Sequence, residues 1–174
     1  RITPSTVPVN PEGLPTVPRN RYRVVIDPGH GGPDPGAVGI GGLRETDVVL
    51  DVSLQVAALL RARGVDVRMT RPSEIDVDLP PRVSLANRSG ATAMVSIHAN
   101  ALSMNRPDVN GIETFYFSDP RSGRLAGHLQ QQMMAVSPGT PGRGVRRGRF
   151  FVIRRTTMPS ALVEMGFVTG EIDA

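Results

Sequence analysis

RVVIDPGHGG, residues 23–32, joins a short apolar run to a glycine-rich loop. Residues 23–26 predict a buried strand, because a short apolar run that ends at a Pro-Gly turn is typical of one. Residues 46–63 predict an amphipathic helix, and Gly64 stands where a helix commonly ends. The expected apolar face of this helix consists of Val49, Val52, Val56, Leu59 and Leu60. A strand, a loop and a helix in this order predict the first unit of an α/β fold.

The rest of the chain continues this alternation. Further strands are predicted at residues 65–69, 93–97, 112–117, 150–153 and 161–163. A short helix is predicted at residues 81–88, and a longer one follows the apolar side chains of Leu125, Leu129, Met133 and Val136. The predicted fold class is therefore α/β, with a mixed, mostly parallel sheet flanked by helices in a three-layer sandwich.

The beginning of the chain differs in composition from the rest. The first twenty residues carry five prolines, whose spacing prevents both a helix and a ladder-bonded strand. We therefore predict a proline-rich linker at residues 1–21 and one domain at residues 22–174, a length that suits a single core. Such a tether is typical of a piece of a longer protein. No apolar run approaches the length of a membrane-spanning helix, so we expect no membrane insertion.

Composition excludes several chemistries. The chain has no cysteine, which rules out disulfides, thiolate metal ligands, iron-sulfur clusters and a cysteine nucleophile. All 20 basic residues are arginines, so Schiff-base chemistry and a P-loop lysine are excluded as well. The glycine-rich loop contains no G-x-G-x-x-G, and no G-x-S-x-G elbow occurs in the chain. Nucleotide binding and serine hydrolysis are therefore not expected.

The formal net charge of +4 suits an anionic partner. The positive charge is concentrated in Arg143, Arg146, Arg147, Arg149, Arg154 and Arg155. Nucleic acid is not the expected partner, because aromatic residues make up only 4% of the chain, tryptophan is absent and no recognition motif accompanies the arginines. Two interpretations stay open: a solvated basic edge, or a surface that holds an acidic substrate.

Four ionisable side chains are candidates for catalytic chemistry. His30 and His98 each follow a predicted strand, where open α/β sheets place their ligand sites. Glu45 opens the first helix and Glu164 ends an apolar strand, where an unpaired buried carboxylate is costly. Two histidines and a glutamate bind the metal in several catalytic zinc sites, and a second glutamate can move the protons of amide hydrolysis. The spacing alone leaves open the alternative of two structural histidines.

Four other polar residues receive structural interpretations. His128 flanks the apolar face of a predicted helix and is expected to be structural or exposed rather than a ligand. Asp27 is expected either to orient a histidine ligand or to form the turn at Pro28. Arg71 and Arg82 are expected to pair with carboxylates.

Between residues 23 and 168 the chain contains, in order, VVIDPGHGG, RETD, GVDVRMTR, LPPRVSLAN, VSIHAN, GIETFYF and PSALVEMGF. This set of motifs resembles the zinc-dependent N-acetylmuramoyl-L-alanine amidases, the family called amidase type 3. The resemblance implies that residues 22–174 are a zinc amidase catalytic domain. It also implies that His30, Glu45 and His98 bind Zn²⁺ and that Glu164 is the catalytic general base and acid.

The resemblance further implies a substrate. The expected reaction is hydrolysis of the amide bond between N-acetylmuramic acid and the L-alanine of the stem peptide in bacterial peptidoglycan. The expected partner is therefore peptidoglycan, both glycan strand and stem peptide, and the expected location is the periplasm or cell wall after export. We expect a monomer, with a possible wall-targeting domain on the N-terminal side. Division, daughter-cell separation, recycling and septal perforation stay open as biological roles.

Two alternatives to this function stay open: a noncatalytic wall-binding module with the same fold, and a zinc peptidase that cuts within the stem peptide. The intact quartet of ionisable residues argues against the first. The bond specificity of the second needs the same metal, water and base, so the residues do not separate it from an amidase.

The chain departs from the family pattern in two places. Members that act at the division septum carry a helical segment that blocks the zinc, whereas residues 100–111 and 140–149 are too short to hold one. We therefore predict a constitutively open groove. Members usually continue beyond the GF motif with a closing helix, whereas this sequence reads VTGEIDA after it. We therefore expect the C-terminal end of the domain to be truncated.

Overall fold

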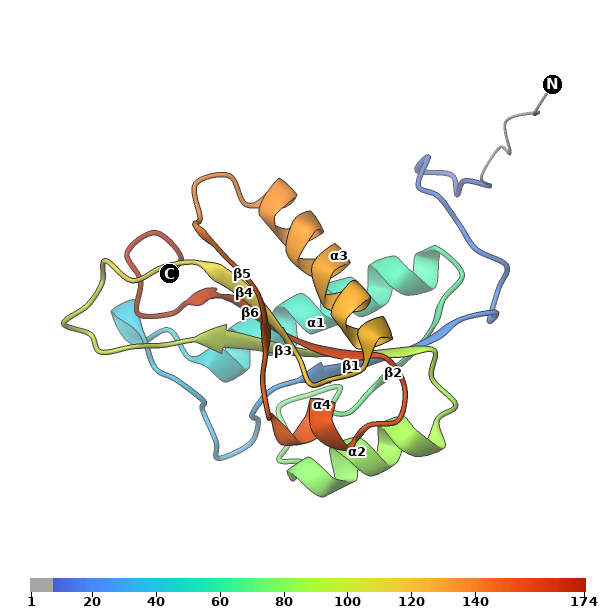
Figure 1. Cartoon of the computed structure of the whole chain (residues 1–174), viewed down its shortest axis with the longest axis horizontal. Helices are drawn as coiled ribbons and strands as arrows, with labels where there is room; N and C mark the ends of the chain where they lie inside the picture. Colours follow the sequence, from blue (N-terminus) through green and yellow to red (C-terminus); the bar gives the residue numbers. More distant parts are fainter. Residues whose placement is uncertain (1–7) are drawn as a thin grey trace.

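The computed structural model describes residues 8–174 (Figure 1). Residues 1–7, the first part of the expected linker, lie outside the described residues. The elements are, in chain order, β1 Arg23–Pro28, a 3-10 turn Ile40–Gly42, α1 Glu45–Ala62, β2 Asp66–Met69, α2 Leu79–Arg88, β3 Ala93–Asn100, β4 Ile112–Tyr116, α3 Pro120–Val136, β5 Gly142–Arg147, α4 Phe151–Arg155 and β6 Ser160–Phe167. Apart from the 3-10 turn, α4 and β5, each element lies close to its predicted position.

The strands form a single six-stranded sheet with the order β2-β1-β3-β6-β4-β5. Neighbouring strands are parallel except for β4 and β6, which are antiparallel. The predicted mixed, mostly parallel sheet is thereby confirmed. Because β4 and β5 run opposite to the other strands, their N-terminal ends lie at the same edge of the sheet as the C-terminal ends of β1, β3 and β6. This edge positions the candidate site.

Helices cover both faces of the sheet, as the prediction of a three-layer sandwich requires (Figure 1). On one face, Val49 of α1 and Leu129 of α3 join the larger apolar core. On the other face, Val83 of α2 and Val152 of α4 join a second core. Each helix buries a stripe of apolar side chains against the pleated surface, which is the main source of its stability.

The buried stripe of α1 differs in part from the prediction. Val49, Ser53 and Ala57 are fully buried, because steps of four residues keep side chains on one face of a helix. Leu59 was expected on this face but is 57% exposed, since it lies about 200° around the helix from Ala57. Val136, the last residue of α3, was also expected on an apolar face and is 79% exposed. Leu59 therefore lies off the buried face of α1, whereas Val136 lies on the same side of α3 as Leu129 but at the exposed end of the helix.

Residues 150–153 do not form the predicted strand. They begin α4, a short helix that buries Val152 and Ile153 against the sheet. The prediction was wrong because four apolar residues fit one helical turn as well as a strand. The sheet also has no position for a strand beside β6, because β6 already pairs with β3 on one side and β4 on the other.

Strand β5 was missed by the sequence reading. Its sequence, GRGVRR, consists mostly of glycine and arginine, whereas strands favour β-branched and aromatic residues. Within the described residues β5 is an edge strand, paired with β4 alone. Charged side chains are common on such edges because they oppose pairing with a further strand. The arginine-rich composition that kept β5 from being predicted as a strand is therefore suited to the edge of the sheet.

The described part of the expected linker lies against the C-terminal end of α1. The amide of Val17 donates to the carbonyl oxygen of Arg63 at 3.0 Å, and the amide of Asn20 donates to that of Gly64 at 3.0 Å. Gly64 has a φ of +91°, a left-handed conformation that suits the helix-ending role predicted for it.

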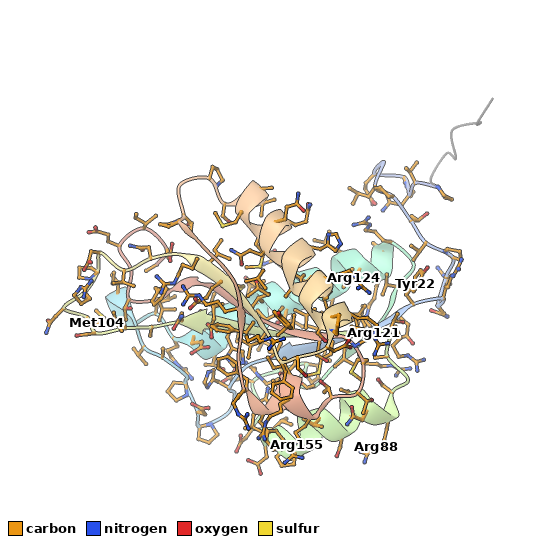
Figure 2. All side chains as sticks on the ribbon, viewed as in Figure 1. Tyr22, Arg88, Met104, Arg121, Arg124 and Arg155 are labelled. Carbon is orange, nitrogen blue, oxygen red and sulfur yellow. The ribbon has the colours of Figure 1, made fainter. Side chains whose placement is uncertain are left out.

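The exposed arginines are distributed over several elements. Figure 2 shows Arg88 on α2, Arg121 and Arg124 on the first turns of α3, and Arg155 at the end of α4. Their charge does not form a single stripe along one element. Among the helices of residues 8–174, none combines the length and the apolar character that crossing a membrane requires.

Candidate metal centre

Two buried arginines hold the backbone of the loop that carries His30. Arg71 donates to the carbonyl oxygens of Pro28 at 3.2 Å and of Gly29 at 2.7 Å. Arg82 donates to the carbonyl oxygen of His30 at 2.6 Å and to that of Pro28. The side chains of Arg71 and Arg82 are 0% and 4% exposed. This arginine clamp fixes the loop through its backbone, independently of any ligand.

Asp27 is the buried counter-ion of the clamp. Its carboxylate pairs with Arg82 at 3.1 Å and accepts hydrogen bonds at 2.6 Å from the hydroxyls of Thr70 and Ser96. It accepts from neither metal-ligand candidate histidine and lies within β1, so both interpretations offered for Asp27 were wrong. The expected pairing with carboxylates is confirmed for both clamp arginines.

His30 follows β1 in a left-handed conformation, with a φ of 59°. Its Nδ1 lies 2.7 Å from Oδ2 of Asp34. A carboxylate that accepts from one ring nitrogen fixes the tautomer and leaves the other nitrogen free to bind a metal. Asp34, which the sequence analysis did not single out, is therefore the carboxylate in contact with this candidate ligand, in place of Asp27.

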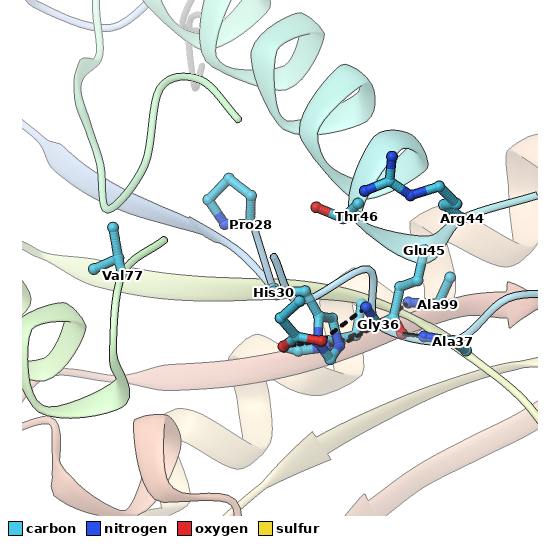
Figure 3. Close-up of polar contacts among 12 residues, drawn as sticks. Pro28, His30, Gly36, Ala37, Arg44, Glu45, Thr46, Val77 and Ala99 are labelled. Carbon is cyan, nitrogen blue, oxygen red and sulfur yellow. Dashed lines mark hydrogen bonds and ion pairs between the residues drawn. The ribbon is translucent and has the colours of Figure 1, made fainter. Parts of the chain in front are cut away.

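Glu45 is the first residue of α1 and points toward His30 (Figure 3). The amide of Ala37 donates to its Oε2 at 2.9 Å, and the amide of Ala99 donates to its Oε1 at 3.1 Å. Oε1 also lies 3.1 Å from Nε2 of His30 and 3.1 Å from Nδ1 of His98. Burial by itself raises the pKa of Glu45, but the hydrogen bonds with His30 and His98 hold that pKa well below its usual value. Glu45 is therefore an ionised carboxylate.

His30, Glu45 and His98 form a group that can hold a metal ion. Each offers one ligand atom, and these atoms all lie within 4.8 Å of one another. Gly29 permits the close packing, since a Cβ at that position would lie 2.3 Å from the ring of His98. His128 is exposed on α3, outside this group, as expected. The structure thus brings the three predicted ligands together from the loop after β1, the start of α1 and β3.

Glu164 lies one strand away from this group. It is opposite His98 in the register of β3 and β6, so the two side chains share a face of the sheet. Ile97 and Ala99 belong to the core under α1, which places His98 on the other face. Both His98 and Glu164 lie within their strands rather than at the ends, because β3 and β6 are longer than predicted.

The carboxyl group of Glu164 is poised to exchange a proton. It is 9% exposed, and its Oε2 has no hydrogen-bond partner among the described residues. Burial raises its pKa to about 8, with further contributions from the negative charges of Glu45 and Glu113. A carboxyl group that titrates near neutral pH is suited to act as a general base and then as a general acid.

Glu113 is a buried residue of this site that the sequence reading missed. It is 5% exposed on β4 and lies opposite Glu164 in the register of β4 and β6. Asn100 donates to its Oε1 at 2.9 Å, and its Oε2 lies 3.5 Å and 3.3 Å from the Nε atoms of Arg143 and Arg146. The available signal was a single carboxylate inside the β-branched and aromatic run GIETFYF.

A pocket of about 350 Å³ opens beside the two histidines. Phe150 contributes an aromatic wall, and Asp34, Asp76 and Asp78 contribute carboxylates. Within the described residues, neither the segment between β3 and β4 nor the segment around β5 contains a helix.

A three-layer α/β domain with two histidines and a glutamate converging at one sheet edge, beside a buried glutamate of raised pKa, has the architecture of a metal-dependent hydrolase. The chain belongs to the N-acetylmuramoyl-L-alanine amidase family, whose model matches residues 24–174. The family resemblance drawn from the motifs is confirmed.

Individual relatives support this membership. LytC of Bacillus subtilis (strain 168), an N-acetylmuramoyl-L-alanine amidase, is 40% identical over 154 residues, which cover 87% of this chain and 30% of that protein. The chain thus spans less than a third of the length of LytC. The structure of the amidase AmiC2 of Nostoc punctiforme matches with a TM-score of 0.84 and 47% identity, over 89% of this chain and 84% of that one. An amidase structure from Clostridium difficile 630 matches with a TM-score of 0.83 and 34% identity, over 88% and 84%.

Proposed function

We propose that this domain is a zinc-dependent N-acetylmuramoyl-L-alanine amidase, which hydrolyses the amide bond between N-acetylmuramic acid and the L-alanine of the peptidoglycan stem peptide. One observation carries the proposal: Nε2 of His30 and Nδ1 of His98 converge on Oε1 of Glu45, in a chain of this family. Glu164 lies in the adjacent strand position.

Zinc suits the donor set. Two imidazole nitrogens and one carboxylate oxygen are a ligand set of catalytic zinc sites, which keep a further position for water or substrate. The hydrogen bond between Asp34 and Nδ1 of His30 presents Nε2 to the metal position. When bound, zinc polarises the scissile carbonyl and lowers the pKa of a water ligand.

Glu164 is the proposed proton carrier. Its carboxylate accepts a proton from the attacking water and donates it to the nitrogen of L-alanine as the carbon–nitrogen bond breaks, so that the peptide leaves as a neutral amine. Burial favours the transfer, because it weakens the carboxylate's competing hydration and raises its proton affinity.

The proposed location of the protein follows from this substrate. Peptidoglycan lies outside the cytoplasmic membrane, so the proposed place of action is the cell wall or periplasm. Residues 1–21 are the proposed linker and residues 22–174 the proposed catalytic domain, acting as a monomer.

Product analysis tests the proposal. Purified peptidoglycan digested by the zinc-loaded domain should release stem peptides whose new amino terminus is L-alanine, and leave glycan strands with intact N-acetylmuramic acid. The matched control is Glu164→Gln, which should retain zinc but show kcat reduced about 10³-fold, because the amide cannot carry the proton. Release of peptides with another amino terminus would instead identify a peptidase. Undiminished hydrolysis by Glu164→Gln would refute the role of Glu164.

A further inference from the structure

The row of polar residues at the site continues beyond Glu164 to a pair of arginines. His98, Glu164 and Glu113 are successive partners across β3, β6 and β4. Both Arg143 and Arg146, from β5, place Nε within 3.5 Å of Oε2 of Glu113. The pair is therefore attached to the same edge of the sheet as the proton carrier.

The charges of this cluster do not balance. Two guanidinium groups share the single carboxylate of Glu113, so these three side chains together carry one positive charge in excess while the neighbouring Glu164 holds its proton. Arg143 is the more fixed of the two: its side chain is 32% exposed, and its guanidinium lies 5.0 Å from the ring centre of Phe167. Arg146 is 54% exposed and presents its remaining donors to solvent. Arginine in this state is well suited to bind a carboxylate through two parallel hydrogen bonds.

Open space adjoins the arginine pair. In the register of β4 and β5, the position opposite Glu113 is Gly144, which has a φ of +83°. A Cβ built at Gly144 would have no atom within 4 Å. The row His98–Glu164–Glu113 therefore ends at Gly144, which has no side chain and lies between Arg143 and Arg146 in the sequence. A ligand carboxylate can approach the excess charge there.

The departing peptide is the part of the substrate that reaches this space. Glu164 gives its proton to the peptide's nitrogen, so that nitrogen lies beside β6 during the reaction. On the other side of the metal ligands, the pocket wall carries Asp34, Asp76 and Asp78, which repel an acidic peptide. Arg82, the arginine that lines this pocket, is already paired with Asp27 and does not offset these carboxylates. Charge thus directs a departing peptide that carries a carboxylate toward β4 and β5, and leaves the pocket to the sugar.

The spacing of the strands allows the departing peptide to reach the arginine pair. Neighbouring strands lie about 4.8 Å apart, so the space over β4 and β5 begins about 5 Å from β6 and extends to about 10 Å. Two extended residues span about 7 Å. A carboxyl group on the second residue of the departing peptide therefore reaches the arginine pair.

We infer that Arg146, supported by Arg143, binds a carboxylate on the second residue of the departing stem peptide and makes the enzyme distinguish a free carboxyl group from an amide there. This inference rests on the proposed amidase function and adds a specificity-determining subsite to it.

Two synthetic muramoyl tripeptides, identical except that the α-carboxyl of the second residue is free or amidated, test the subsite. The zinc-loaded wild type should show a KM about tenfold lower for the free acid, a factor that corresponds to about 1.4 kcal/mol. Arg146→Met should raise the KM for the free acid to that for the amide, with kcat unchanged. The affinity of Arg146→Met for the free tripeptide product, measured by calorimetry, should be about tenfold lower than that of the wild type.

The matched control is Arg147→Met. Arg147 is the next residue of β5 and lies over the ring of Tyr116, away from Glu113. This variant should leave both KM values and the peptide affinity unchanged, and both variants should unfold at the wild-type temperature. If the wild type cleaves both substrates with equal KM, or if Arg146→Met changes nothing, the subsite is refuted while the amidase function stands. If the wild type cleaves neither substrate at the muramoyl bond, the proposed function fails and the subsite fails with it.

Discussion

The two halves of the site differ in how completely the protein satisfies its own polar groups. In the metal half, built from β1, α1 and β3, the buried charges are all paired: Asp27 has three partners, and Glu45 accepts from two backbone amides and contacts two histidines. In the substrate half, built from β6, β4 and β5, Oε2 of Glu164 is buried without a hydrogen-bond partner among the described residues. Oε2 of Glu113 and Nε of Arg143 also lack a hydrogen bond there, and they are held only by the longer ion pairs of Glu113 with Arg143 and Arg146.

This difference follows from what each half must do. Ligands of a metal must be held in place before the metal arrives, and accordingly Asp34 contacts the second nitrogen of His30 and the amide of Ala37 donates to the second oxygen of Glu45. Groups that exchange protons or contact a substrate need unused hydrogen-bonding capacity, and burial makes that unused capacity costly in the free protein. We therefore expect substitutions in the metal half to remove zinc or stability, and substitutions in the substrate half to change turnover, specificity or pH dependence.

The largest expected effect comes from removing a metal ligand. His98→Ala should lower both bound zinc and hydrolysis to background, because two remaining donors cannot hold the ion in a catalytic geometry. Metal content after gel filtration and product release from peptidoglycan measure the two losses. His128→Ala is the matched control, since His128 is an exposed histidine on α3. Equal zinc content in both variants would show that His98 is not a ligand.

The second largest effect should be on stability, from opening the arginine clamp. Arg82→Met leaves the carboxylate of Asp27 buried without its ion pair, which should reduce the free energy of unfolding by about 4 kcal/mol. Arg88→Met, on the exposed side of the same helix, should change it by less than about 0.5 kcal/mol. Urea unfolding of both variants provides the comparison. A loss in Arg82→Met no larger than in Arg88→Met would contradict the clamp.

The metal half was also the half that the sequence predicted best. Its proposed ligands His30, Glu45 and His98 stand in distinct motifs at the ends of predicted elements, and the mostly parallel topology brings such ends to one edge. Of the substrate half, the sequence predicted only Glu164. The family resemblance then assigned their roles. These features are local in sequence, so a single chain reveals them.

The remaining features depend on contacts between distant segments, which periodicity does not report. The orienting role of Asp34 requires the left-handed turn at His30. The burial of Glu113 requires β4 to insert between β6 and β5, and β5 itself was hidden by its arginines. Residues 150–153 lie at the start of a helix that packs Val152 and Ile153 against a face of the sheet, and a run of four apolar residues does not reveal this packing. Tertiary context decided each of these.

The third effect is a pH dependence of stability that comes from Glu164 in the substrate half. Burial raises the pKa of Glu164 from its usual 4.5 to about 8, so the folded protein binds this proton more tightly than the unfolded chain. The stabilisation from protonation is fully present below pH 4.5 and is lost as the pH rises through 8. Metal-free wild type, prepared with a chelator, should therefore lose on the order of 3–4 kcal/mol relative to Glu164→Gln between pH 5 and pH 8. Parallel pH dependences of the two proteins would contradict the raised pKa.

The smallest effect should come from the residue that orients a ligand without binding the metal. Asp34→Ala removes the acceptor at Nδ1 of His30, so the ring loses its fixed tautomer while its Nε2 remains. Zinc affinity should fall about tenfold, measured by competition with a chelator of known affinity, and kcat at saturating zinc should change little. Asp47→Ala, on the exposed surface of α1, is the control. Because the arginine clamp holds the backbone of His30 independently of Asp34, complete loss of zinc in Asp34→Ala would mean that the metal half is less preorganised than its hydrogen bonds indicate.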